Sequence, residues 1–234
     1  MNTQVKLQIE ALAKANPTEE ICGFLYHGLD SVIIYPCANI AADKATEFEI
    51  DSQDYITCNE LGPICAIYHS HPQNPAFSEA DISLSDEMSL PILVFAIAES
   101  EWNEYIPKSY QVKLEGRQFS WGFNDCYGLI RDYYRQAQGH YMRDYDRDDS
   151  FPETDGGTIL ANIDNEGFYD TGSLVDVQIG DVILFHSNRA LPQHFGIFIG
   201  NSRFLHHPLG TLSRVELLFG NWRKRIVKIL RKKT

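Results

Sequence analysis

The most constraining feature of this sequence is that its chemically reactive residues fall into two groups, one in each half of a 234-residue chain. The first group combines acids, histidines and a serine, and it consists of Glu20, His69, His71, Ser78 and Asp81. The second group consists of Cys126, His194 and His206. The first set of residue types is that of a hydrolytic metal site, and the second is typical of a thiol hydrolase. Two unrelated ways of hydrolysing an amide restrict the possible functions more than either group does alone.

Charge divides the chain in the same way. Residues 1–113 contain 5 lysines and no arginine against 17 acidic residues, whereas residues 114–234 contain 15 basic and 15 acidic residues. The whole net charge of −12 therefore belongs to the first half. Parts of a single core seldom differ this sharply, so we predict two domains, residues 1–113 and residues 114–234.

The five cysteines form no CxxC pair and no dense disulfide framework: they are Cys22, Cys37, Cys58, Cys65 and Cys126. This pattern is typical of reduced thiols in a protein made in a cytoplasm. No basic segment leads into an apolar core at the N-terminus, so we expect no signal peptide. The longest apolar run, residues 90–98, contains a proline and is too short to span a bilayer, so it predicts a buried strand. We expect neither a membrane span nor a nucleic-acid partner.

His69 and His71 follow an apolar run that predicts a strand over residues 64–68. Side chains two apart on a strand point to the same face, so both rings can reach one ion. Ser78 is a candidate N-cap for the helix that follows, and Asp81 is the third helical residue, where it can supply a third ligand. Two histidines, one carboxylate and an open position for water suit catalytic zinc, which lowers the pKa of bound water to about 7.

The first 105 residues resemble the JAMM (MPN-type) metallopeptidases. The resemblance consists of an upstream Glu in Glu-x-Cys-Gly, then His-x-His-Pro, and a later Ser-x-x-Asp. It implies an α/β sandwich in which Glu20 is the general base, and in which His69, His71 and Asp81 hold Zn²⁺. It also implies that Ser78 helps to stabilise the oxyanion of the tetrahedral intermediate.

Two features leave alternatives open for the first group. The loop between His71 and Ser78 has six residues, 72–77, where the family usually has seven, so the positions of Ser78 and Asp81 depend on how the loop adapts. The other interpretation is that the histidines are ordinary polar residues at a strand end and that Ser78 and Asp81 form an ordinary capping box. Whether a site of this kind retains zinc and activity is a separate question.

Cys126 lies at the predicted start of a helix in the second half. Apolar residues at 129, 130, 133, 134 and 137 have helical spacing, and the pattern closes at Gly139. Asp125 or Asn124 is the natural N-cap, which places Cys126 in the first turn. Unpaired amides and the helix dipole there favour an anion, so we expect a stabilised thiolate. The alternative is that Cys126 is a capped core residue.

The two histidines of the second group lie on neighbouring predicted strands. A three-residue turn at 200–202 would pair residue 199 with 203 and residue 196 with 206, so that His194 and His206 share a face with Cβ atoms roughly 7 Å apart. A two-residue turn would place them on opposite faces. His194 can then serve as the base for the thiol and His206 can orient it. His207 competes for the orienting role, but the spacing favours His206.

These segments resemble the NlpC-type cell-wall peptidases, a papain-like family. The matching motifs are Asp-Cys-Tyr-Gly-Leu-Ile at 125–130, His-Phe-Gly-Ile-Phe-Ile-Gly at 194–200 and Phe-Leu-His at 204–206. The resemblance implies that Cys126 is the nucleophile, His194 the base and His206 the orienting residue. Many members place a Tyr upstream of the Cys to assist the oxyanion, and this chain has none there, which leaves the backbone amide of Cys126 for that role.

The polar segment 140–178 is rich in Gly and Asp and predicts a long surface excursion. It separates the helix that follows Cys126 from the strands that carry the two histidines. We therefore expect it to border the cleft of the thiol site without belonging to the core.

JAMM-type and NlpC-type units in this order are similar to the protein K family, the tail-tip assembly proteins of lambda-like long-tailed bacteriophages. The resemblance extends over nearly the whole chain, including Gly-Arg-x-Phe at 116–119 and the run Leu-His-His-Pro-Leu-Gly at 205–210. It implies an α+β chain of two domains, an MPN-type α/β sandwich followed by a papain-like domain. It also implies other tail-tip proteins as partners.

The family resemblance supplies a substrate as well, namely the peptide stems of peptidoglycan, cut next to the D-glutamyl-linked diamino acid. A wall substrate and the lack of a signal peptide are compatible if the chain is made in the host cytoplasm and carried at the tail tip of the virion. Two alternatives belong to other classes. One is an assembly factor that processes or chaperones another tail protein, with one or both sites vestigial. The other is an isopeptidase for ubiquitin-like carriers, against which the wall-type second half counts.

Overall fold

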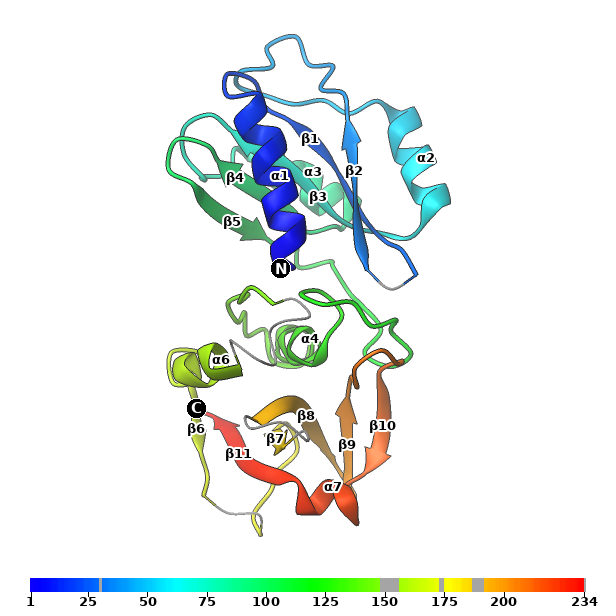
Figure 1. Cartoon of the computed structure of the whole chain (residues 1–234), viewed down its shortest axis with the longest axis vertical. Helices are drawn as coiled ribbons and strands as arrows, with labels where there is room; N and C mark the ends of the chain where they lie inside the picture. The colour runs from blue at the N-terminus through cyan, green and yellow to red at the C-terminus, as the bar shows by residue number, and fades with distance from the viewer. Residues whose placement is uncertain (30, 148–155, 173–174, 187–191, 234) are drawn as a thin grey trace. The chain divides into compact units, whose positions relative to one another are not determined.

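The computed structural model describes residues 1–29, 31–147, 156–172, 175–186 and 192–233 (Figure 1). The chain divides into two compact units. The N-terminal unit is Gln4–Gln111, and the C-terminal unit is Val112–Thr234 together with Met1–Thr3. Each unit contains one mixed arrangement of helices around a single sheet, so the predicted α+β class is confirmed. Within the described residues, none of the helices has the length and apolar character that a membrane crossing requires.

The N-terminal unit is built on a five-stranded sheet in the order β2-β1-β3-β4-β5. Its elements in chain order are α1 (Thr3–Ala15), β1 (Cys22–His27), β2 (Val32–Cys37), α2 (Ser52–Leu61), β3 (Ile64–His71), α3 (Glu79–Met88), β4 (Ile92–Ala96) and β5 (Glu101–Tyr105). Only β3 and β4 run parallel among these strands, because α3 provides the crossover that a parallel pair needs.

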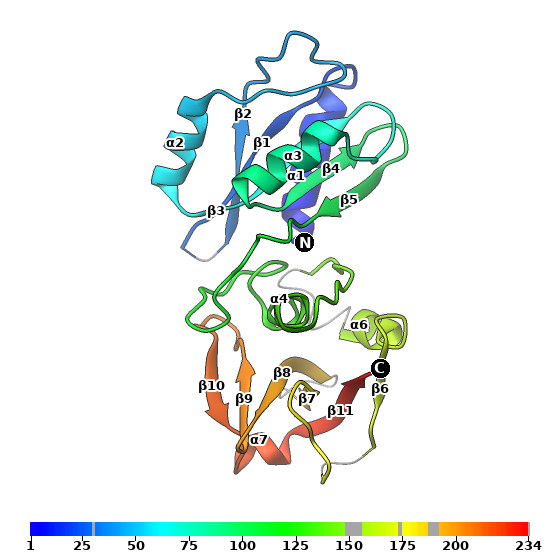
Figure 2. The ribbon, with the colours of Figure 1, turned by 180° about the vertical axis from the view of Figure 1, so that it is seen from behind.

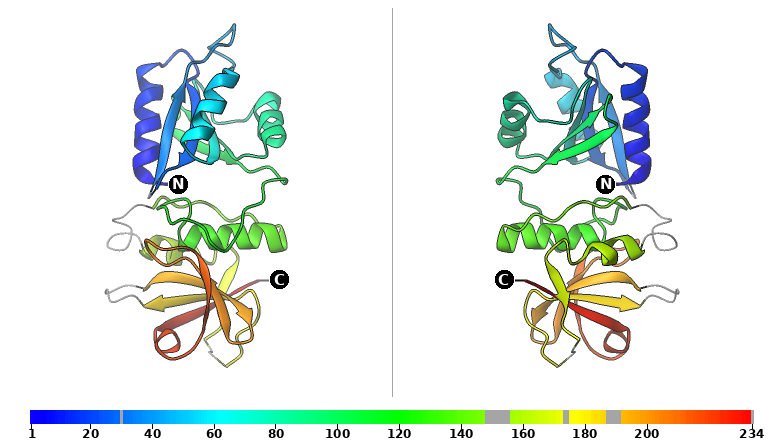
Figure 3. Two further views of the ribbon diagram at one scale, coloured as in Figure 1. Left: turned by 90° about the vertical axis from the view of Figure 1, so that its right-hand side faces the viewer. Right: turned by 90° about the vertical axis from the view of Figure 1, so that its left-hand side faces the viewer.

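Helices cover both faces of this sheet. Figures 1, 2 and 3 show α1 against one face and α3 against the other. A strand covered on both faces should be apolar throughout, and all five residues of β4 are buried. The apolar run that predicted a buried strand is therefore confirmed as β4. Helix α3 begins where the Ser-x-x-Asp motif predicted, because the side chains of Ser78 and Asp81 each bond the other residue's backbone N–H.

The C-terminal unit is built on a six-stranded antiparallel sheet in the order β10-β9-β8-β7-β11-β6. Its elements in chain order are α4 (Cys126–Gln138), α6 (Gly156–Asn162), β6 (Phe168–Asp170), β7 (Val182–His186), β8 (Pro192–Gly200), β9 (Arg203–His206), β10 (Arg214–Leu217), α7 (Asn221–Lys224) and β11 (Ile226–Lys232). Helix α4 packs against β8, with Cys126, Ile130 and Phe195 in one apolar cluster. Its predicted limits are confirmed, with Asp125 as N-cap and Gly139 as C-cap.

The turn between β8 and β9 differs from the prediction. Gly200 pairs with Arg203, so the turn has two residues and not three. These residues, Asn201 and Ser202, both have a φ of 51°, and positive φ at both central positions defines the type I′ turn that suits a hairpin. The prediction that residue 199 faces residue 203 is therefore wrong.

A β-bulge compensates for the shorter turn. The register shifts between Phe198 and Gly200, so Ile199 is an extra residue in β8. Below the bulge, Gly196 faces His206, as the sequence predicted. The bulge supplies the residue that the turn lacks, and His194 therefore still lies on the same face of the sheet as His206.

The described part of segment 140–178 lies largely at the surface, as predicted, but a few of its residues anchor it in the core. Met142, Arg147, Ile159 and Phe168 are all buried, and three of them belong to the apolar cluster beneath α4. Residues 148–155 and 173–174 of the predicted excursion lie outside the described residues. The polar composition hid Met142, Ile159 and Phe168 because they are isolated apolar residues, and it hid Arg147 because a charged residue is rarely buried.

Arg147 forms a buried ion pair with the N-cap of α4. Its Nε donates to Asp125 Oδ2 over 2.7 Å, and neither side chain is exposed. Its Nη1 donates to Asp144 over 2.8 Å, and its guanidinium lies 4.8 Å from the centre of the Tyr127 ring. Asp125 also accepts the backbone N–H of Gly128 over 2.7 Å. The start of the helix that carries Cys126 is thus fixed by a charge pair inside the core.

Removal of the Arg147 charge should destabilise the C-terminal unit. Arg147→Met leaves Asp125 buried without its cation, and loss of one partner of a buried pair costs about 3 kcal/mol or more. We expect urea unfolding of the intact chain to show that decrease in the free energy of unfolding. Arg203→Met is the control, because Arg203 is exposed and the change should stay within about 0.5 kcal/mol. Equal effects of the two substitutions would contradict a stabilising pair.

Candidate functional sites

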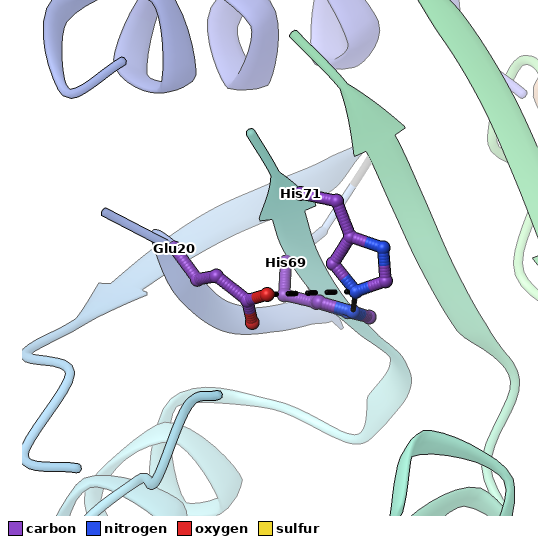
Figure 4. A group of neighbouring side chains, drawn as sticks. All are labelled: Glu20, His69 and His71. Carbon is purple, nitrogen blue, oxygen red and sulfur yellow. Dashed lines mark hydrogen bonds and ion pairs between the residues drawn. The ribbon is translucent and has the colours of Figure 1, made fainter. Parts of the chain in front are cut away.

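The first candidate site lies at one end of the sheet in the N-terminal unit. His69 and His71 lie at the C-terminal end of β3, two residues apart and therefore on one face. Glu20 lies just before β1, and Figure 4 shows its carboxylate directed toward the two rings. Asp81 comes from the first turn of α3. Three separate elements thus bring four ligand-type side chains to one place.

The distances in this cluster suit a tetrahedral ion. The Nε2 atoms of His69 and His71 are 2.9 Å apart, and Asp81 lies 3.4 Å from the first and 3.6 Å from the second. Glu20 Oε1 lies 3.6 Å from Nε2 of His71. Ligands about 2.0–2.1 Å from a tetrahedral zinc are separated by roughly 3.3 Å, so these side chains fit such an ion. The site therefore has the spacing of a metal centre.

Surrounding contacts orient the two rings. His71 Nδ1 lies 3.0 Å from the carbonyl oxygen of Asn74 and donates to it, so in the neutral ring Nε2 carries the lone pair that a metal would need. Phe48 stacks on His69 at 4.6 Å, and burial lowers the pKa of His69 and keeps its ring neutral. Nδ1 of His69 makes no hydrogen bond with any described residue.

The two carboxylates differ in their readiness to take a proton. Burial raises the pKa of Glu20 to about 7, although the nearby His71 opposes the shift. Burial acts in the same direction on Asp81, but the adjacent His69 and His71, together with the backbone N–H of Ser78, outweigh it and hold the pKa of Asp81 well below its usual range. Asp81 has the character of an ionised ligand, whereas Glu20 has that of a group that exchanges protons near neutral pH.

Ser78 is the N-cap of α3, and its hydroxyl accepts the backbone N–H of Asp81 over 3.1 Å. Its own backbone N–H donates to Asp81 Oδ2 over 2.7 Å. The six-residue loop before Ser78 therefore still delivers Asp81 to the histidines. The hydroxyl proton of Ser78 is not used by the cap, which leaves it available for an oxyanion.

The second candidate site lies where α4 packs on β8. Cys126 is the first residue of α4 and is 7% exposed. The backbone N–H groups of Phe195 and Tyr127 face its sulfur and favour its anionic form. Phe195 follows His194 directly, so the thiol is placed next to the strand position of the predicted base. Among the described residues, no hydrogen bond joins the Cys126 thiol to the His194 ring.

Cys126 is not a thiolate in the free protein. Burial and the neighbouring Asp125 raise the pKa of Cys126 to about 12, and this outweighs the backbone N–H groups and Arg147. The expectation of a stabilised thiolate is therefore wrong for the free protein. The helix start favours an anion, but removing the sulfur from water costs more. Cys126 is a neutral thiol at neutral pH, and it needs a base.

His194 and His206 form the pair that the sequence predicted to share a face. Nε2 of His194 lies 2.8 Å from Nδ1 of His206. His207 points elsewhere and donates from Nε2 to the carbonyl oxygen of Thr211 over 3.1 Å. Burial lowers the pKa of His206 to about 4 and, together with the nearby His206, lowers that of His194 well below 6.5. Both rings are neutral at neutral pH, and a neutral imidazole can accept a proton.

The sequence did not point to two further residues near this pair. Glu216 of β10 places Oε1 3.3 Å from Nε2 of His206. Trp222 of α7 donates its indole N–H to Glu216 over 2.6 Å and packs its ring against both histidines. The sequence offered one indication of Glu216: it lies in a strand that follows the strand ending at His206.

Comparison with known families assigns a type to each unit. Residues 116–231 match the NlpC/P60 family, and residues 2–109 match the prokaryotic homologues of the JAB domain. The first match suggests a peptidase-type hydrolase for the C-terminal unit. The second, together with the cluster of Glu20, His69 and His71, points to a metal in the N-terminal unit.

Two relatives match most of the chain. The tail tip assembly protein K of Escherichia phage N15 is 30% identical over 234 residues, which cover 96% of this chain and 93% of that protein. The protein of the same name from Escherichia phage lambda is 33% identical over 174 residues, which cover 74% and 84%. A solved NLP/P60-family structure from Staphylococcus aureus is 16% identical, covers 98% of this chain and 62% of that one, and has a TM-score of only 0.37.

The N-terminal cluster should bind one zinc ion per chain. His69→Ala or Asp81→Asn removes a ligand and should abolish binding, whereas Glu20→Gln should retain the ion, because a general base need not be a ligand. Metal analysis of protein expressed with ample zinc measures this directly. Far less than one ion per wild-type chain would contradict the site, and loss of zinc in Glu20→Gln would make Glu20 a ligand.

Cys126 should react slowly with iodoacetamide at neutral pH. Its raised pKa of about 12 leaves little thiolate at pH 7, and the rate should keep rising with pH beyond pH 9, where an ordinary thiol levels off. Mass spectrometry of the peptide containing Cys126 gives the rate, with free cysteine as the reference. Labelling faster than the reference at pH 7 would show a resting thiolate.

Proposed function

The chain belongs to the tail tip assembly protein K family, and on that premise we propose that it is a phage tail tip assembly protein whose C-terminal unit hydrolyses the stem peptides of peptidoglycan. The observation that carries the proposal is the buried thiol of Cys126 beside β8, the strand that bears His194, whose neutral ring contacts His206 of β9. The proposed partners are other tail proteins, and the proposed location is the tail tip after synthesis in the host cytoplasm.

The proposed reaction begins with proton transfer from the thiol of Cys126 to His194. The thiolate attacks the carbonyl carbon of the amide, and the backbone N–H of Cys126 donates to the developing oxyanion. The His194 imidazolium then gives its proton to the leaving amine, and a thioester remains on Cys126. Water attacks the thioester, with His194 again as the base, and releases the carboxylic acid and the free thiol. His206 holds the ring of His194 throughout.

The proposed bond is the amide between the D-glutamyl residue of the stem peptide and the diamino acid that follows it. The NlpC/P60 match of residues 116–231 supports a peptidase, and the tail-protein relatives support an encounter with a cell wall.

A second activity is proposed for the N-terminal unit, namely a zinc peptidase that acts on another tail protein. His69, His71 and Asp81 would hold the ion, which when bound would lower the pKa of a water and polarise a carbonyl. Glu20 accepts a proton from water and returns it to the leaving amine. The Ser78 hydroxyl donates a hydrogen bond to the oxyanion. The distances around His71 and the pKa of Glu20 near 7 support this assignment.

The first activity is tested with a synthetic stem peptide and the intact chain. Cys126→Ala should lower the hydrolysis rate by at least about 10³-fold, because the nucleophile is gone. Glu20→Gln is the matched control from the other site and should hydrolyse the peptide at the wild-type rate, with or without a chelator. Circular dichroism establishes that each variant is folded.

Near wild-type activity of Cys126→Ala would exclude the thiol mechanism. Loss of activity in Glu20→Gln or on chelation would instead assign the stem peptide to the metal site. If the wild type cleaves no stem peptide while its zinc site is filled, the chain acts in assembly without wall hydrolysis.

A further inference from the structure

We propose that Glu216 is a positioning residue that fixes the proton on His206 and, through it, the proton on His194. The inference rests on the proposed roles of Cys126 and His194. It adds a fourth residue to the thiol site, one that touches neither the substrate nor the sulfur. As a result, Nδ1 of His194 carries no proton and can accept the proton of the Cys126 thiol.

The three residues lie on one face of three neighbouring strands. His206 of β9 faces Gly196 of β8 on one side and Arg214 of β10 on the other. His194 and Glu216 are each two residues from these partners, and residues two apart on a strand share a face. His194, His206 and Glu216 therefore form a diagonal row across β8, β9 and β10. The row depends on the bulge in β8, because that bulge sets the register of His194.

Contacts follow this row. Nε2 of His194 lies 2.8 Å from Nδ1 of His206, and Nε2 of His206 lies 3.3 Å from Oε1 of Glu216. The His206 ring is completely buried, and its Nε2 has no hydrogen bond of regular geometry with any described residue. A buried imidazole N–H needs an acceptor, and the Glu216 carboxylate is the group placed to serve.

The carboxylate itself is held by two other donors. Arg214 Nε donates to Oε1 of Glu216 over 2.6 Å, and the indole N–H of Trp222 donates to Oε2 over 2.6 Å. Burial would raise the pKa of Glu216, but these hydrogen bonds outweigh it and lower the pKa, so the group is ionised. An ionised carboxylate accepts hydrogen bonds and cannot donate them.

Each neutral imidazole carries one proton, on either Nδ1 or Nε2. A single acceptor at one end of the row therefore determines which nitrogen is protonated in both rings. The Glu216 carboxylate requires the proton of His206 on Nε2, which leaves Nδ1 of His206 as an acceptor. That acceptor requires the proton of His194 on Nε2. Nδ1 of His194 is then bare, and it is the ring nitrogen that His206 does not engage. A thiol can give its proton only to a bare nitrogen.

The reverse arrangement would be inactive. With the proton of His206 on Nδ1, its bare Nε2 would face a carboxylate, and two lone pairs would repel each other in a buried site. The proton of His194 would then lie on Nδ1, where it blocks transfer from Cys126. Removal of Glu216 takes away the group that makes the active arrangement of protons lower in free energy than the inactive one.

Nitrogen-15 NMR of the ring nitrogens in the intact chain tests the proposal without any substrate. Correlations between ring nitrogens and carbon-bound protons distinguish a protonated from a bare nitrogen in each histidine. We expect both His206 and His194 of the wild type to carry their protons on Nε2. A proton on Nδ1 of either ring in the wild type would overturn the proposal.

Variants then test the cause. Glu216→Ala should give a mixture of the two arrangements in both rings, whereas Glu216→Gln, whose amide oxygen can still accept from His206, should restore the wild-type state in part. Thr211→Val is the control, because it removes a contact of Arg214 over 2.8 Å and leaves Glu216 in place, so both rings should be unchanged. Identical ring spectra for the wild type and Glu216→Ala would overturn the proposal.

Kinetics provide the functional readout. Glu216→Ala should lower kcat for stem-peptide hydrolysis by roughly 10- to 100-fold with little change in KM, as expected for an outer partner of a working histidine. Unchanged kcat with changed ring states would overturn the link to catalysis. If the wild type hydrolyses no peptide but Glu216 still sets both ring states, the proposed function fails and the positioning of the two histidines stands.

Discussion

The register between β8 and β9 is the constraint on which the thiol site depends. Side chains alternate between the two faces of a sheet, so a slip of one residue would move His194 to the face opposite His206. Two local features together set the register: the type I′ turn at Asn201 and Ser202, and the bulge at Ile199. Their combined effect brings the two rings within 2.8 Å, and it extends the row to Glu216 on the next strand.

Burial sets the chemical state of both sites. Removal from water keeps Cys126 as a thiol and keeps His194 and His206 neutral, so the free protein holds a base and an acid that have not yet exchanged a proton. In the N-terminal unit, burial raises the pKa of Glu20 to about 7, while hydrogen bonds keep Asp81 ionised. Burial thus sets the protonation state of the thiol site and raises the pKa of Glu20, whereas hydrogen bonds decide the charge of Asp81.

Features that depend on local chemistry were predictable from the sequence. The Ser-x-x-Asp spacing predicted the capping box of α3, the apolar period and Gly139 predicted the limits of α4, and the two motifs predicted the α+β class. Features that depend on distant contacts were not predictable. The bulge at Ile199 leaves no mark in a hydrophobic pattern, and the burial of Arg147 depends on its pairing with Asp125. The state of the Cys126 thiol depends on the packing of α4 against β8, which a helix period does not specify.

The central claim is that this chain cuts the wall peptide at the D-glutamyl bond with Cys126. Mass spectrometry of the fragments released from purified peptidoglycan by the intact chain, with a chelator present, tests it most directly. Cleavage at the proposed bond would release fragments that end in the D-glutamyl residue, matched by fragments with a new free amine on the diamino acid. Cleavage at any other bond, or release that stops when the chelator is added, would contradict the account.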